Sequence, residues 1–177
     1  EFFWDDKNGG FFITADDAEQ LIARPKELYD GAIPSGNSVA MLNLLKLARI
    51  TAKSEYENKA HALLKSFGAY VSRSPSSFAQ LMSALSFAHG PSFEIVVVGD
   101  GDAADKLIAS VNSVYLPNKV VILKNTLNSA DLADIAPYTK MQTQIDGKAA
   151  VYICRGFACE QPLTDPADVK SKLNQIL

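Results

Sequence analysis

Two apolar runs rich in β-branched residues place the strongest constraint on the fold of this chain. "FEIVVVG" (residues 93–99) and "NKVVILK" (118–124) are continuous rather than alternating, which is typical of strands buried on both faces of a sheet. Between them, a helix is expected over residues 103–114 with one apolar face, formed by Leu107, Ile108, Val111 and Val114. This order predicts a βαβ unit with a right-handed crossover.

The rest of the C-terminal half adds further elements to this unit. A short helix is expected near residues 129–136, and "KAAVYIC" (148–154) predicts a third strand. The final segment predicts a helix with Asp165 as N-cap and Pro166 in its first turn. Residues 91–177 are therefore expected to form a small α/β unit with a mainly parallel sheet.

Helical periodicity dominates the N-terminal half, residues 1–90. Residues 39–50 are apolar on almost every side, which predicts an inner helix. A capping-box sequence at Ser54–Glu57 opens a second helix, and Ser74-Pro75 supplies a cap and an N1 proline for a third. The short links between them predict antiparallel helical hairpins, so the whole chain is expected to be of mixed α/β class.

The segment before these helices is open to two interpretations. "GGFFIT" (residues 9–14) is apolar and β-prone, and "AEQLIARPKE" (18–27) follows an acidic turn, which together predict a β-hairpin lying over a loop region. The alternative is a short helix opened by Thr14, with Asp17 three residues later in a capping-box pattern. The hairpin is the favoured interpretation.

Composition excludes several classes of protein. The 177 residues carry a net charge of −3, so no basic footprint for nucleic acid is present. No apolar run approaches the about 18 residues that would span a membrane. The start "EFFW" has neither an initiator Met nor a basic signal-peptide region, which suggests a piece cut from a longer chain. Two cysteines do not make a secreted disulfide framework, so a cytoplasmic location is predicted.

A glycine-rich motif follows the first buried strand. "GDGDAA" (residues 99–104) has the GxGxxA pattern of a dinucleotide fingerprint. Asp100 and Asp102, however, put two negative charges where a pyrophosphate would need backbone donors. No acidic ribose ligand follows the second strand, which ends at Lys124-Asn125. A tight βα turn is the favoured interpretation, and no cofactor is expected.

The two cysteines are five residues apart. Fully extended, the chain from Cys154 to Cys159 spans roughly 16 Å, whereas a disulfide needs Cα atoms within about 7 Å. The chain must therefore turn if the cysteines are to meet, and Gly156 makes a turn easy. The spacing is not C-x-x-C, and His61 and His89 lack ligand spacing, so no metal site is expected. Two structural thiols are favoured, with a redox couple as the alternative.

The richest polar chemistry lies in residues 24–38. Six side chains there could bind a polyol through a guanidinium, an ammonium, carboxylates, a hydroxyl and an amide: Arg24, Lys26, Glu27, Asp30, Ser35 and Asn37. Aromatic residues on which sugars could stack are Phe2, Phe3, Trp4 and Tyr29. The same polar groups could instead form an ion-pair network and cap backbone in a rigid loop. The pattern leaves both interpretations open.

Five stretches together resemble a known family: "FFWDDKNGGFFIT", "LIARPKELYDGAIPSGNSVAMLNLLKLA", "EIVVVGD", "YLPNKVVI" and "VYICRGFACEQPLTDP". They are similar to the C-terminal part of the spermatogenesis-associated thioredoxin-domain proteins. In that family a thioredoxin-like domain precedes a six-hairpin (α/α) toroid similar to N-acylglucosamine 2-epimerases, and a short α/β tail follows. The resemblance implies that residues 1–90 are the last toroid hairpins and residues 91–177 the tail.

Two functional hypotheses follow. In the first, the loop at residues 24–38 lines the mouth of a carbohydrate-type toroid and binds or isomerises a sugar, with any catalytic histidine supplied by the absent part. In the second, the chain is a non-catalytic, redox-linked interaction module in which Cys154 and Cys159 are the partner or substrate of the thioredoxin-like domain. Inner helices without their toroid neighbours would also expose apolar surface, so self-association of the fragment is expected.

Overall fold

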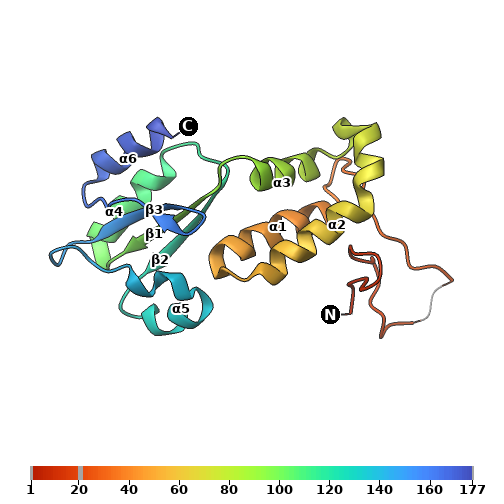
Figure 1. The fold of residues 1–177 in the computed structure, drawn as a ribbon, viewed down its shortest axis with the longest axis horizontal. Helices are drawn as coiled ribbons and strands as arrows, with labels where there is room; N and C mark the ends of the chain where they lie inside the picture. The colour runs from red at the N-terminus through yellow and green to blue at the C-terminus, as the bar shows by residue number, and fades with distance from the viewer. Residues whose placement is uncertain (1, 20–21, 177) are drawn as a thin grey trace. The chain divides into compact units, whose positions relative to one another are not determined.

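The computed structural model describes residues 2–19 and 22–176 of the chain. Within these ranges it contains six α-helices, two short 3₁₀ helices and one four-stranded sheet, so the predicted mixed α/β class is confirmed (Figure 1). The chain forms two compact units. The first comprises residues 1–48 and 53–90, and the second comprises residues 49–52 and 91–177. None of the helices in the described ranges is both long and apolar enough to cross a membrane.

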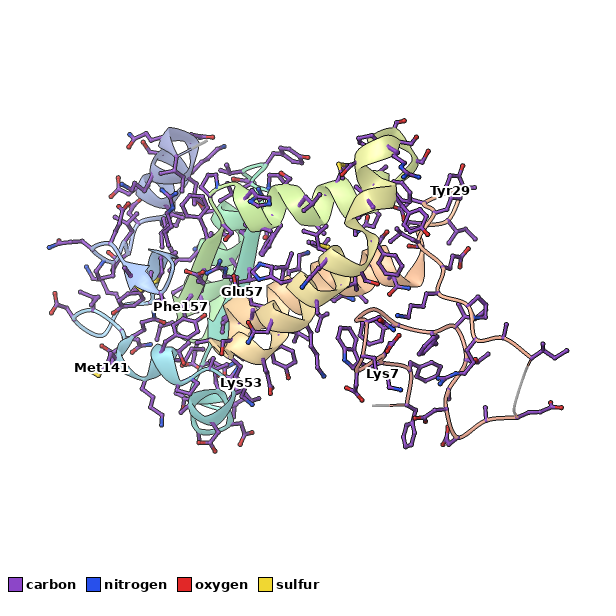
Figure 2. The ribbon with its side chains drawn as sticks, turned by 45° about the vertical axis from the view of Figure 1, so that its right-hand side comes forward. Lys7, Tyr29, Lys53, Glu57, Met141 and Phe157 are labelled. Atoms are coloured by element: carbon purple, nitrogen blue, oxygen red, sulfur yellow. A yellow bond between two sulfur atoms is a disulfide. The ribbon has the colours of Figure 1, made fainter. Side chains whose placement is uncertain are left out.

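The first unit is helical. Its helices are α1 (Gly36–Thr51, whose last turn belongs to the second unit), α2 (Ser54–Arg73), the 3₁₀ helix η1 (Pro75–Ser77) and α3 (Ala79–His89). Helices α1 and α2 lie side by side in both views (Figures 1 and 2). All three α-helices contribute fully buried side chains, among them Met41, Leu63 and Leu81. The arrangement of a toroid stays a prediction.

The predicted proline start of the third helix differs in detail. Pro75 opens η1 rather than α3, and α3 begins four residues later at Ala79. The residue at the N-cap position of α3 is Phe78, which offers no side-chain hydrogen bond to the helix. The cap is supplied instead by a residue far away in the sequence, as described below.

The segment before α1 contains no regular helix or strand in its described residues, so the predicted hairpin of residues 9–14 and 18–27 is replaced by sparser pairing. An isolated antiparallel bridge joins Trp4 and Phe11. The Ile13 amide donates to the Pro25 carbonyl at 3.1 Å, so the two predicted strands do approach each other. Residues 20–21, within the second of them, lie outside the described residues. Side chains, rather than a strand ladder, form many of the hydrogen bonds to the backbone of this segment.

The second unit is built on a sheet of strand order β2-β1-β3-β4. The strands are β1 (Phe93–Val98), β2 (Lys119–Lys124), β3 (Ala150–Arg155) and the short β4 (Ala158–Cys159). Strands β1 and β2 are parallel and are connected by α4 (Gly101–Asn112), so the βαβ unit forms as predicted. Strand β3 runs antiparallel to β1, and β4 antiparallel to β3. The sheet is therefore mixed, which corrects the prediction of a mainly parallel one.

The connection between β2 and β3 explains the antiparallel strand. It contains α5 (Ser129–Ile135) and η2 (Pro137–Met141). Lys124, the last residue of β2, donates from Nζ to the carbonyl oxygens of Thr139 at 2.7 Å and Gln142 at 2.8 Å. These bonds hold the connection at the carboxyl end of β2. Because the chain does not cross back along the sheet, β3 starts from that end and must run antiparallel.

The two faces of the sheet have separate cores. One face packs against α4 and α6 (Pro166–Gln175) through Ile95, Val97, Leu107, Val151, Val169 and Leu173. The other face carries Val96, Ile122, Ala150, Tyr152 and Cys154, against which Leu132 and Tyr138 pack. The Asp165 carboxylate accepts from the Ala167 amide at 2.7 Å, which confirms the predicted N-cap of α6.

Candidate functional site: the Cys154–Cys159 hairpin

The basic residues of the predicted sugar-binding loop bond to nearby parts of their own unit. The Arg24 guanidinium donates to the Thr14 carbonyl at 2.8 Å and lies 4.3 Å from the centre of the Phe12 ring. Lys26 Nζ lies 2.6 Å from Asp5 Oδ2, and its ammonium holds the pKa of the Asp5 carboxyl well below the usual value. Both cations therefore brace the segment before α1.

The Asn37 amide replaces part of a strand ladder. Its Oδ1 accepts from the Phe11 amide at 2.7 Å, and its Nδ2 donates to the carbonyls of Phe11 at 2.9 Å and Glu27 at 2.8 Å. One buried side chain thus pairs with two backbone segments that precede it. This is why the predicted hairpin region is ordered without continuous strands.

Asp30 joins the beginnings of α1 and α3. Its Oδ2 accepts from the amides of Gln80 at 2.9 Å and Leu81 at 3.1 Å, and its Oδ1 accepts from the Ser35 amide at 2.9 Å. Ser35 Oγ accepts in turn from the Ser38 amide at 3.1 Å. The six predicted residues lie in one region, but these bonds are those of the rigid capped loop, and sugar binding there stays a prediction.

The two cysteines meet across a tight hairpin. Cys154 in β3 and Cys159 in β4 are register partners and form a disulfide, with Cα atoms 3.8 Å apart. The turn between them has positive φ at both central residues, 57° at Gly156 and 66° at Phe157, as a type I′ hairpin turn requires. The predicted turn at Gly156 is therefore present, but the favoured interpretation of two structural thiols is wrong, because the two sulfurs are bonded to each other. Cys154 is 1% exposed, whereas Cys159 is exposed.

Gln142 contacts both sulfur atoms. Its Nε2 lies 3.2 Å from Cys159 Sγ and 3.6 Å from Cys154 Sγ, in position to donate to either. The residue is buried, and its Oε1 has no hydrogen-bond partner within the described part of the chain. Gln142 follows η2, which the Lys124 bonds hold in place. The amide is thus fixed against the disulfide from the neighbouring connection.

A buried carboxyl group lies across the sheet from Cys154. Glu94 in β1 is the register partner of Cys154, so both side chains lie on the same face of the sheet. Glu94 is fully buried, and its Oε2 accepts from the Phe157 amide at 3.0 Å. Its Oε1 lies 3.8 Å from Arg49 Nη1. Burial raises the pKa of Glu94, and the Phe157 amide and the Arg49 charge oppose that rise without cancelling it.

Aromatic side chains cover this group. The rings of Phe157 and Tyr138 meet edge to face with centroids 5.0 Å apart, and the Arg49 guanidinium lies 6.0 Å from the Phe157 ring centre. Figure 2 labels Phe157 on the hairpin. The Tyr138 hydroxyl donates to the Arg49 carbonyl at 3.3 Å, and burial and the charge of Glu94 raise the pKa of Tyr138. The carboxyl group is therefore shielded from water.

Sequence reasoning missed two members of this site. Glu94 had a signal, because it is the one charged residue within the otherwise apolar run "FEIVVVG". A charge inside a strand buried on both faces needs a partner or a function. Gln142 had no comparable signal, since a single glutamine in a loose segment is unremarkable and only the fold brings it to the sulfurs.

The glycine-rich motif forms a tight βα turn, as its sequence favoured. Asp100 Oδ1 accepts from both the amide and the hydroxyl of Thr126, which ties the βα turn to the residues after β2. A pocket of about 540 Å³ lies beside it, and its lining includes Asp100, Asp102, Lys106 and Lys148. Among the described residues, no cluster of three or more His, Cys, Asp or Glu could hold a metal ion.

The fold and this hairpin define a mixed α/β chain with a disulfide beside a buried carboxyl group. It is similar to spermatogenesis-associated protein 20, with 35% identity to the rat protein over 99% of this chain and 35% to the human protein over 98%. It is also 29% identical to the uncharacterized protein B0495.5 of Caenorhabditis elegans over 98% of the chain. No family model matches.

The chain is therefore similar over nearly its whole length to part of spermatogenesis-associated protein 20, as its motifs indicated. It spans less than a quarter of the length of these relatives, 23% of the rat protein and 22% of the human protein. The thioredoxin-like domain and the complete toroid stay predictions.

Proposed function

We propose that the Cys154–Cys159 hairpin is a thiol–disulfide exchange site within a redox-linked interaction module. The observation that supports this most is the asymmetry of the disulfide, which joins an exposed residue, Cys159, to a buried one, Cys154. A partner thiolate can approach Cys159, whereas Cys154 is buried. Such access decides which sulfur of a disulfide is attacked.

The exchange balances with a dithiol partner. A partner thiolate attacks Cys159 Sγ; a new intermolecular S–S bond forms, and the Cys154–Cys159 bond breaks with its electron pair on Cys154 Sγ, which is then protonated. The partner's second thiolate then attacks the partner's first sulfur in the mixed disulfide. Cys159 leaves as a thiolate and is protonated. The hairpin is reduced by two electrons, and the partner dithiol is oxidised to a disulfide. The predicted partner is the thioredoxin-like domain of the longer protein.

Gln142 suits the first of these steps. When the disulfide opens, negative charge develops on the Cys154 sulfur, and a hydrogen-bond donor stabilises a thiolate relative to the thiol. Gln142 Nε2 is such a donor and already lies beside both sulfurs. The site therefore offers a polarised leaving sulfur without a metal ion.

Two single-cysteine variants of the full chain test the proposal. Cys154→Ser leaves the exposed Cys159, and Cys159→Ser leaves the buried Cys154. After incubation with oxidised glutathione, we expect Cys154→Ser to form the mixed disulfide at least about tenfold faster, because only its sulfur is accessible. The adduct is measured by intact mass after acid quenching. Equal rates would contradict the asymmetry on which the proposal rests.

Native reduction supplies the second part of this test. Wild-type protein should lose its disulfide to dithiothreitol without denaturant and regain it after the reductant is removed, with free thiols counted by alkylation. A disulfide that is reduced only after unfolding would instead be structural. Sugar binding at residues 24–38 is the other candidate, and no contact in the described structure favours it over a braced loop.

A further inference from the structure

We infer that Glu94 is the proton-transfer partner of Cys154, accepting the thiol proton when the hairpin disulfide closes and returning it when the disulfide opens. This inference rests on the proposed exchange and assigns a role to the one buried carboxyl group of the site. It begins from placement: Glu94 and Cys154 are register partners in β1 and β3 and share one face of the sheet.

The surroundings of Glu94 limit where its proton can go. The charged and titratable groups facing it are Arg49 from the last turn of α1, Tyr138 from η2 and Cys154 from β3. A guanidinium group is not deprotonated in proteins, so it cannot act as the acid here. The Tyr138 hydroxyl donates to a backbone carbonyl and has a raised pKa. The Cys154 thiol of the reduced protein is the remaining acid.

Electrostatics couples these two groups. A Cys154 thiolate beside a Glu94 carboxylate would place two negative charges in a buried region, which is costly, so the pair is expected to hold one proton between them. The raised pKa of Glu94 makes its carboxylate a better base than an exposed one. The Glu94 carboxylate can therefore accept the proton of the Cys154 thiol, and the proton stays within the site.

The hairpin links this proton to the sulfur chemistry. Glu94 Oε2 accepts from the Phe157 amide, which lies in the turn between the two cysteines. In closure, Cys154 loses its proton to Glu94, its thiolate attacks Cys159 Sγ of a mixed disulfide, and the partner thiolate leaves. Protonated Glu94 keeps this proton in the closed hairpin and returns it to Cys154 when the disulfide next opens. One S–S bond is broken and one is formed.

A two-phase thiol assay isolates this step. When the reduced full chain meets excess 5,5′-dithiobis(2-nitrobenzoic acid), Cys159 releases one thionitrobenzoate at a rate proportional to reagent. Closure by Cys154 then releases a second one at a rate independent of reagent. We expect Glu94→Gln to leave the first phase unchanged and slow the second about 100-fold at neutral pH, because the amide accepts the Phe157 bond but no proton.

The matched control is Glu160→Gln, the same substitution next to Cys159 on an exposed side chain whose partner is Lys172. Both phases should keep wild-type rates in that variant. A second phase of Glu94→Gln within twofold of wild type across the pH range would overturn the inference while leaving the exchange site intact. Absence of a second phase in wild type would overturn the exchange itself, and with it this inference.

A second variant keeps the test decisive if Glu94→Gln does not fold. The cation of Arg49 lowers the pKa of Glu94. The rate of the second phase rises with pH as Glu94 ionises. In Arg49→Gln the midpoint of this pH dependence should therefore lie at a higher pH than in wild type. An unchanged midpoint would show that a group other than Glu94 controls closure.

Discussion

Glu94 illustrates how one buried residue can set the pH dependence of stability. Its pKa is raised by burial above the ordinary value of a glutamate side chain, so the folded state binds the proton more tightly than the unfolded state does. The stabilising effect of protonation is complete below that ordinary value and is lost as the pH rises through the raised one. Unfolding free energy should therefore fall across this window.

Urea denaturation of wild type and Glu94→Gln at steps from about pH 4 to about pH 8 measures this effect. Other groups titrate in both proteins, so the difference between the two curves isolates Glu94. We expect wild type to lose stability relative to the variant as the pH rises. A difference independent of pH would show that the Glu94 carboxyl has the same pKa in the folded and unfolded states.

At the scale of single elements, the hairpin turn depends on Gly156. Its φ of 57° is unfavourable for residues with a Cβ, and no atom of the described residues lies within 4 Å of the place where a Cβ would be added. Gly156→Ala should therefore lower the unfolding free energy by about 1 kcal/mol through backbone strain alone. Gly156→Asn should cost less, because Asn tolerates this conformation. Equal effects of Ala and Asn would contradict this explanation.

The single elements also differ in how far the sequence could predict them. Strand β1 was predictable because its β-branched run is continuous, and it is buried on both faces as expected. The run of β2 also predicted a strand, but burial on both faces was wrong there, because β2 lies at the edge of the sheet and Val121 is exposed. The N-cap of α6 was predictable because Asp165 and Pro166 are adjacent. The direction of β3 was not predictable. It depends on hydrogen bonds from Lys124, at the end of β2, to Thr139 and Gln142 in the connection that follows. The polar residues of the loop were identified from their types, but their partners were set by the fold.

For the whole molecule, the division into two compact units predicts separable stability. Asp30→Ala removes the carboxylate that caps α3 within the first unit, which should cost about 1–2 kcal/mol of local stability. Hydrogen exchange followed by peptide mass should show faster exchange in α3, with β1 and β3 unchanged. Faster exchange throughout both units would show that they unfold together.

Asp30→Asn is the matched control for that experiment, because it keeps an oxygen able to accept one of the bonds while removing the charge. Its exchange in α3 should lie between those of wild type and Asp30→Ala. If both variants match wild type, the bonds from Asp30 to the amides of Gln80 and Leu81 do not stabilise the helix.

The pairing of Cys154 with Cys159 has a practical consequence for anyone who prepares this protein. A slip of β4 by one residue against β3 would turn one sulfur to the opposite side of the sheet, where no bond between them can form. A closed disulfide is therefore covalent evidence that β3 and β4 are correctly aligned in that molecule. In protein kept oxidised, the mass difference between an alkylated sample and its reduced, alkylated counterpart counts the molecules that carry this bond.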